Sequence, residues 1–399
     1  MKRMSWAVAV LFLVAALAGW GAGTARAEVG VTADTIKLGT FQDMSGPGAY
    51  LGRMCTTSLD IWMKYVNNQL GGIHGRKLEL VVEDNKYDPE LTKTAFTKLV
   101  DKHQVFAIVL VYGSGPCVAV KEDITKAKVP VFPTMATVDS MFEPPSRYLY
   151  WYACNDADNA IMMVDFIKDD LKIGTKDAVI GVCYQDDEWG KSALKGAEIA
   201  GEKYGYKVVA APYKKGSKNL SPEVMKMKAA GVTHCFYAGY APVYAMLLKE
   251  ANKVGWKPTF FGDYVTVDPR TFAAGQLADG HYHFFNVGLR SEKTPGWQEI
   301  EKLFNDAGAQ ELLNVPLIPL LWNSLTFLTK ALQDAGPDLT REKLIDALDS
   351  IKGFDTKGNG EIEYGPNIRK GTHKYRVLKC DAANQIFVPI TDWREPSIK

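Results

Sequence analysis

The sequence of 399 residues lacks most of the motifs that catalytic, metal and nucleotide sites need. Its six cysteines include no C-x-x-C pair, and its six histidines form no H-E-x-x-H and no cluster with metal-ligand spacing. It has no phosphate loop, and no G-x-G-x-x-G follows a predicted strand. We therefore expect no metal, no cofactor and no enzymatic activity.

The chain also lacks an excess of charge of either sign. The formal net charge is +1, and it becomes −2 without the first 27 residues, which carry three basic residues and no acidic one. A nearly neutral chain offers no footprint for nucleic acid or for an anionic membrane surface. With 47% hydrophobic and 23% charged residues, the composition is that of an ordinary globular protein.

Only one long apolar run occurs, at residues 6–20, and it is too short for a comfortable membrane span. Lys2 and Arg3 precede this run, and Ala-Arg-Ala at 25–27 has the small residues of a cleavage site. We predict that residues 1–27 are a signal peptide and that the chain from Glu28 is a periplasmic protein, not inserted in a membrane. No cysteine directly follows the run, so acylation to a lipoprotein is not expected.

All six cysteines follow the predicted signal peptide. An oxidising compartment permits disulfides. Cys183 and Cys235 lie in apolar, strand-like runs, so they are candidates for a pair, and buried free thiols fit the same pattern.

The remaining 372 residues fit two domains better than one. Strand-like runs alternate with helix-length segments in two series, which predicts parallel sheets with helical crossovers and therefore two doubly wound α/β lobes. The predicted strands are 36–41, 77–84, 106–111 and 129–133, then 178–184, 207–212, 234–237 and 259–261. Helices at 317–335 and 340–350 and a hairpin at 375–389 depart from this alternation.

A glycine turn follows the strand at 106–111 and contains Gly113, Ser114, Gly115 and Pro116. We expect a helix over 117–128, with Pro116 near its first turn. Glycines allow a close approach of backbone to ligand, and a helix start beside a serine hydroxyl suits an anion such as a carboxylate. An ordinary strand-to-helix turn is the alternative.

Other polar segments follow predicted strands, at 44–50, 134–137 and 262–264 and at Tyr240, and the polar segment 155–158 opens the second series. Each by itself is compatible with a helix cap or a turn. In a parallel sheet, ligands bind beyond the carboxyl ends of the strands. All of these segments would face one crevice if the two lobes open toward each other.

Three other patterns favour structure over chemistry. Residues 355–366 imitate a calcium loop but place Lys357 and Pro366 where ligands are needed, so we expect a turn. Residues 281–283 carry two histidines without a third ligand. Ser114 is not in a G-x-S-x-G elbow, and no histidine lies at an informative position for Cys117, so an envelope hydrolase is only a minor alternative.

The segments at 46–47, 71–76, 83–89, 184–190, 236–240 and 261–263 together resemble the periplasmic leucine/isoleucine/valine-binding proteins of ABC importers. The resemblance implies the type I periplasmic binding fold, with three crossovers near Ala153, Asn286 and Thr372. Lobe 1 is then expected to comprise 28–153 plus 287–371, and lobe 2 to comprise 154–286 plus 372–399. The ligand would be enclosed between the lobes, and an ABC permease would be the partner.

The resemblance also assigns roles to residues. Ser114 would bind the ligand carboxylate, helped by Thr134, Ala136 and Thr137 after the next strand. On the other lobe, Asp156, Tyr240 and Asp263 would bind an ammonium group, with Tyr264 as an alternative to Asp263.

Aromatic residues expected around the crevice include Tyr50, Tyr112 and Tyr264, and the serine run of the family is interrupted by glycines here. The expected ligand is a branched-chain or other apolar or aromatic amino acid; an amide, urea or an aromatic carboxylic acid is the alternative.

Overall fold

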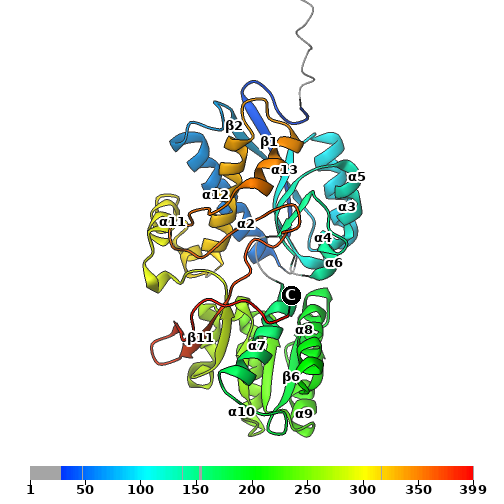
Figure 1. The fold of residues 1–399 in the computed structure, drawn as a ribbon, viewed down its shortest axis with the longest axis vertical. Coiled ribbons are helices and arrows are strands. Elements are labelled where there is room, and N and C mark those ends of the chain that lie inside the picture. Colours follow the sequence, from blue (N-terminus) through cyan, green and yellow to red (C-terminus); the bar gives the residue numbers. More distant parts are fainter. Residues whose placement is uncertain (1–27, 47, 137, 152–154, 316, 399) are drawn as a thin grey trace, which may run out of the picture.

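The computed structural model describes residues 28–46, 48–136, 138–151, 155–315 and 317–398. Two sheets form the centres of two lobes, one above the other in Figure 1. The first lobe is built on a five-stranded sheet with the order β2-β1-β3-β4-β5. The second lobe is built on a seven-stranded sheet with the order β12-β11-β10-β9-β8-β6-β7.

The first lobe takes up the N-terminal part of the described chain. Its elements are β1 (Thr35–Gln42), α2 (Ala49–Lys64), η1 (Tyr65–Gln69), β2 (Lys77–Asp84), α3 (Pro89–Thr97), η2 (Lys98–Lys102), β3 (Ala107–Tyr112), α4 (Ser114–Ala119), α5 (Lys121–Ala127), β4 (Val131–Met135), α6 (Asp139–Phe142) and β5 (Leu149–Trp151).

All pairings in this sheet are parallel. The central strand β3 reads Ala-Ile-Val-Leu-Val-Tyr, and all six residues are buried, as expected for a parallel strand covered by helices on both faces. Asp88 caps α3 by accepting hydrogen bonds from the backbone N–H groups of Glu90 and Leu91.

The second lobe follows in the chain. Its elements are α7 (Asp156–Asp169), β6 (Val179–Gln185), α8 (Glu188–Tyr204), β7 (Lys207–Tyr213), α9 (Ser221–Ala229), β8 (His234–Ala238), α10 (Ala241–Lys253), β9 (Thr259–Gly262), η3 (Tyr264–Thr266), η4 (Pro269–Ala278), β10 (Tyr282–Phe285), β11 (Arg376–Asp381) and β12 (Ile386–Pro389). Strands β6 to β10 are parallel, and the hairpin β11–β12 adds an antiparallel edge.

Between β10 and β11 the chain returns to the first lobe (Figure 1). This part contains η5 (Arg290–Glu292), α11 (Pro295–Asp306), η6 (Gln310–Asn314), α12 (Ile318–Asp334) and α13 (Arg341–Ser350). Helix α12 packs on α2 and β4. Arg341 fixes α13 to the lobe, because its guanidinium donates to the carbonyl oxygens of Val105 and Phe106 at 2.8 Å each.

The predicted α/β fold with two doubly wound lobes is confirmed, with the antiparallel hairpin as an edge of the second sheet. The crossover predicted near Ala153 lies outside the described residues. The helix predicted over 117–128 is wrong in its bounds: α4 already begins at Ser114, and Val120, with φ −111° and ψ 5°, separates it from α5. Pro116 is compatible with this earlier start, because the first turn of a helix needs no N–H group from it.

Cys183 and Cys235 do not form a disulfide, and both are buried free thiols, as are Cys55, Cys117 and Cys380. Cys154 lies outside the described residues. Within the described ranges, no helix combines the length and the apolar character needed to cross a bilayer.

Candidate functional site

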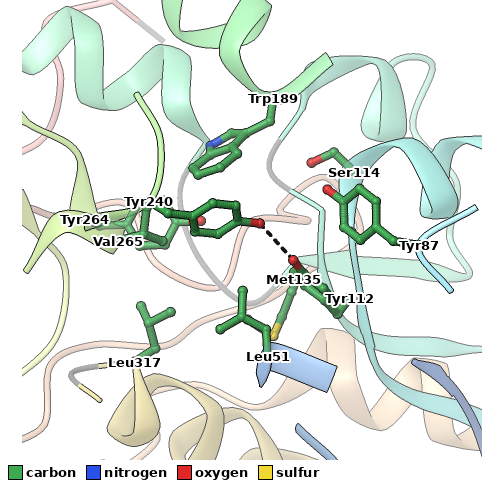
Figure 2. A pocket seen from close by; sticks show the side chains of 11 residues that line it. Leu51, Tyr87, Tyr112, Ser114, Met135, Trp189, Tyr240, Tyr264, Val265 and Leu317 are labelled. Atoms are coloured by element: carbon green, nitrogen blue, oxygen red, sulfur yellow. Dashed lines mark hydrogen bonds between the residues drawn. The ribbon is translucent and has the colours of Figure 1, made fainter. Parts of the chain in front are cut away.

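The two lobes meet at the carboxyl ends of their parallel strands. Tyr112 is the last residue of β3 in the first lobe, and Tyr240 precedes α10 in the second lobe. Their phenol oxygens are 2.8 Å apart and share a hydrogen bond that joins the lobes (Figure 2). The ends of β3 and β8 therefore face each other across one interface, as expected for this sheet topology.

A cavity of about 30 Å³ adjoins this hydrogen bond. Tyrosine, tryptophan and aliphatic side chains surround it in Figure 2. The residues that line it are Leu51, Tyr87, Tyr112, Gly113, Ser114, Met135, Trp189, Tyr240, Tyr264, Val265 and Leu317. None of these described lining residues carries a formal charge at neutral pH, and their polar side-chain groups are hydroxyls and the indole N–H of Trp189.

The aromatic side chains form one wall from each lobe. In the first lobe, the rings of Tyr87 and Tyr112 have their centroids 5.3 Å apart. In the second lobe, Trp189 and Tyr240 are 5.0 Å apart. Tilted pairs at these distances are favourable arrangements of aromatic rings. Burial raises the pKa of Tyr240 to about 12, so its phenol is a neutral hydroxyl at physiological pH.

An irregular strand end places Tyr112 and Ser114. Leu110 has φ +48° inside β3, and its carbonyl oxygen accepts hydrogen bonds from the side chains of Thr40 and Gln42. In the register of β3 with β4, Val109 pairs with Phe132 and Val111 pairs with Thr134, and Leu110 between them is not paired. Gly113 follows with φ +104°, a conformation open to glycine and strained for other residues. The backbone therefore departs from regular strand geometry at Leu110 and again at Gly113, just before the cavity.

Asp156 and Asp263, the two acidic residues predicted to bind an ammonium group, are buried but do not line the cavity. Asp263 accepts hydrogen bonds from the backbone N–H groups of Gly239 at 3.1 Å and Thr266 at 3.2 Å, and so caps η3. Burial, and secondarily the negative charge of Asp156, raises the pKa of Asp263 well above its usual value. Asp156 is the first residue of α7 and has no exposed surface.

Four of the ten site residues predicted from the sequence line the cavity: Tyr112, Ser114, Tyr240 and Tyr264. Thr134 and Ala136 are buried at the end of β4 but are not part of the lining. Asp156 and Asp263 are buried as described above. Thr137 lies outside the described residues. Tyr50 is 41% exposed on α2, where the guanidinium of Arg270 stacks on its ring.

The cavity also contains residues that the sequence did not single out as ligand contacts: Leu51, Tyr87, Met135, Trp189, Val265 and Leu317. Met135 directly follows Thr134, and Trp189 lies in one of the segments that carry the family resemblance. For these two, proximity to a strand end was a usable signal. Leu317 offered none, because only the return of the chain to the first lobe places it there.

Cys117 and the two histidines at 281 and 283 are either buried or hydrogen-bonded to hydroxyl groups. Cys117 is buried, and burial raises the pKa of its thiol far above the usual range, which disfavours the nucleophilic thiolate. His281 and His283 bind the hydroxyls of Tyr244 and Thr266 through their Nδ1 atoms. No three His, Cys, Asp or Glu side chains of the described chain are grouped as a metal site would require.

Comparisons with known proteins agree with this geometry. The family described as "Periplasmic binding protein" matches residues 35–385. The Leu/Ile/Val-binding protein homolog 7 of Brucella suis is 27% identical over 362 residues, which cover 88% of this chain and 86% of the relative.

Two solved structures share the fold. The fatty acid ABC transporter substrate-binding protein from Thermomonospora curvata has a TM-score of 0.83 at 24% identity and covers 93% of this chain and 95% of its own. A solute-binding protein from R. palustris in complex with 4-hydroxybenzoate has a TM-score of 0.78 at 20% identity, with coverages of 91% and 98%. From its matched residues and its two-lobed fold, this chain belongs to the periplasmic binding protein family.

Proposed function

We propose that this protein is the solute-binding component of an ABC importer, that it acts in the periplasm after removal of residues 1–27, and that it delivers its ligand to a membrane permease. Family membership and the predicted signal peptide support this role. We also propose that it binds without turnover. The lining of the cavity offers no histidine or carboxylate among the described residues for acid–base catalysis.

For the ligand, we propose an aromatic carboxylic acid. The single observation that carries this choice is a lining of four tyrosines, one tryptophan and aliphatic residues without a charged side chain. Aromatic walls accommodate a ring, and the hydroxyls of Ser114, Tyr112 and Tyr240 are donors for a carboxylate. The R. palustris protein bound to 4-hydroxybenzoate shows that this fold accommodates such a ligand.

A branched-chain amino acid is the second candidate, supported by the name of the Brucella suis relative. Such a ligand carries an ammonium group, which calls for an anionic partner when it is buried, just as a buried carboxylate calls for hydrogen-bond donors such as these hydroxyls. Asp156 and Asp263 do not line the cavity, and the raised pKa of Asp263 disfavours its charged form. The geometry therefore favours a ligand without an ammonium group.

Binding requires the lobes to separate first. A cavity of about 30 Å³ holds only one or two water molecules. A ligand the size of benzoate enters only when the hydrogen bond between Tyr112 and Tyr240 opens. When the lobes close on a ligand with this hydrogen bond still open, both phenols are available to the ligand. A ligand that contacts both lobes favours the closed state, which is the form that we propose the permease recognises.

Ser114→Ala should weaken the binding of an aromatic acid about ten- to a hundredfold, because a hydrogen bond to a charged group contributes roughly 1.5–3 kcal/mol. Titration calorimetry of ligand-stripped protein with benzoate, 4-hydroxybenzoate, phenylalanine and leucine would measure both the preference and this loss. Benzoate and 4-hydroxybenzoate should bind, and phenylalanine and leucine, which carry an ammonium group, should not.

Ser350→Ala is the matched control, because its hydroxyl donates to the carbonyl of Ala347 in the remote helix α13. It should leave the affinity unchanged. Full affinity in Ser114→Ala would contradict the carboxylate contact. Tight binding of leucine, lost in Asp156→Asn or Asp263→Asn, would replace the aromatic acid by an amino acid and leave the transport role intact.

A further inference from the structure

Two cations of the second lobe contact aromatic rings of the first lobe. Lys215 follows β7, and its Nζ lies 3.5 Å from the ring centroid of Tyr87. Arg270 belongs to η4, and its guanidinium carbon lies 4.7 Å from the ring centroid of Tyr50 on α2. Both distances are within the range of a cation–π attraction. Neither cation lines the cavity.

The geometry of Arg270 is fixed within its own lobe. Its Nε and Nη2 atoms donate to the two carboxylate oxygens of Asp268 at 2.8 and 2.7 Å. Asp268 is itself buried and caps η4 through the backbone N–H of Arg270. This bidentate contact with Asp268 holds the planar guanidinium in the position in which it stacks on the ring of Tyr50. The partner ring remains 41% exposed, so it contributes little to the core of the first lobe.

Lys215 lies in the electrostatic field of carboxylates from both lobes. Partial burial lowers its pKa below the usual value, while the carboxylates of Asp187 and Asp43 act in the opposite direction. Asp43 belongs to the first lobe, where it accepts hydrogen bonds from the backbone N–H groups of Gly46 and Gly48 at 2.5 Å each. The first lobe thus presents both a ring and a fixed carboxylate to this ammonium group.

We propose that the pairs Lys215–Tyr87 and Arg270–Tyr50 are closing contacts, which set the fraction of molecules whose lobes are together and so the apparent affinity. The proposal rests on the proposed function, in which the ligand is enclosed between the lobes. Each pair joins the two lobes, so opening the lobes breaks it. Each pair would form again when the lobes close on a ligand, so the two cations stabilise every enclosed complex alike and tune binding without selecting the ligand.

Lys215→Met and Arg270→Met remove the charges and keep long side chains. Each should lower the closed fraction of the protein without added ligand and weaken every bound ligand by the same factor, about two- to fivefold. The double variant should weaken binding about five- to twentyfold. Lys214→Met removes a neighbouring exposed charge and is the matched control, expected to change neither quantity.

The closed fraction can be measured by single-molecule energy transfer between dyes on azido side chains at Glu90 of α3 and Met225 of α9, both of which are exposed. At position 50, Tyr50→Phe should retain the closed fraction, since the ring remains, and Tyr50→Leu should reduce it.

Energy transfer needs no ligand, so a shift toward the open state in both Met variants supports the closing contacts even if the aromatic acid proves wrong. Unchanged energy transfer in both variants would overturn the proposal. A loss of affinity that differs between ligands would also overturn it, because that result would make the cations selectivity residues.

Discussion

Gly113→Ala should cost about 3 kcal/mol of folding stability and weaken ligand binding more than tenfold. Gly113 has φ +104°, which an alanine adopts only with strain. An added Cβ would lie 2.8 Å from Cε2 of Tyr87, a ring that lines the cavity and packs on Tyr112. The clash therefore acts on the same aromatic wall that we propose contacts the ligand. Urea unfolding and calorimetry measure the two effects.

Gly115→Ala is the matched control in the same turn. No atom lies within 4 Å of a Cβ built at Gly115, and the residue belongs to α4. Alanine is favoured over glycine in a helix by roughly 1 kcal/mol, so this variant should be as stable as the parent or slightly more so. Equal stability of the two variants would show that Gly113 tolerates a side chain and would contradict the strained turn.

The sequence was sufficient to predict the fold and those site residues whose positions follow directly from the fold. Alternating strands and helices predict parallel sheets, and parallel sheets bind ligands at their carboxyl ends. That rule, together with the family resemblance, located Tyr112 at the end of β3, Ser114 just after it and Tyr240 before α10, and all three line the cavity. The hydrophobic period and the turn residues are local features of the chain, so they can be recognised in a single sequence.

The remaining features depend on contacts between distant parts of the chain. Leu317 reaches the cavity because α12 packs back on the first lobe. The positive φ of Leu110 is hidden inside an apolar run that reads as a regular strand. The segment 262–264 is compatible with a helix cap, and Asp263 does cap η3, but its complete burial depends on packing between distant segments. Local patterns locate a residue in an element; packing determines what its side chain touches.

Acidification from pH 6.5 to 4 should lower the free energy of unfolding, and His281 alone should account for roughly 3 kcal/mol of the loss. Burial lowers the pKa of His281 to about 4, from about 6.5 in an unfolded chain. Between these values the unfolded chain binds a proton that the folded protein does not, so stability is complete above pH 6.5 and decreases toward pH 4. Burial, and secondarily His281, lowers the pKa of His283 well below its usual value, so His283 acts in the same direction.

His281→Gln should therefore flatten the decrease of stability between pH 6.5 and 4, measured by urea unfolding at several pH values. A glutamine amide retains a partner for the hydroxyl of Tyr244, which lies 3.2 Å from Nδ1 of His281. The raised pKa of Asp263 has the opposite effect, because it favours the folded state at low pH. The comparison is therefore between each variant and the parent, in the slope of unfolding free energy against pH. His74→Gln, at an exposed site, should leave the slope of the parent. If His281→Gln kept that slope too, proton uptake at the partly buried ring of His281 would not be the cause of the acid sensitivity.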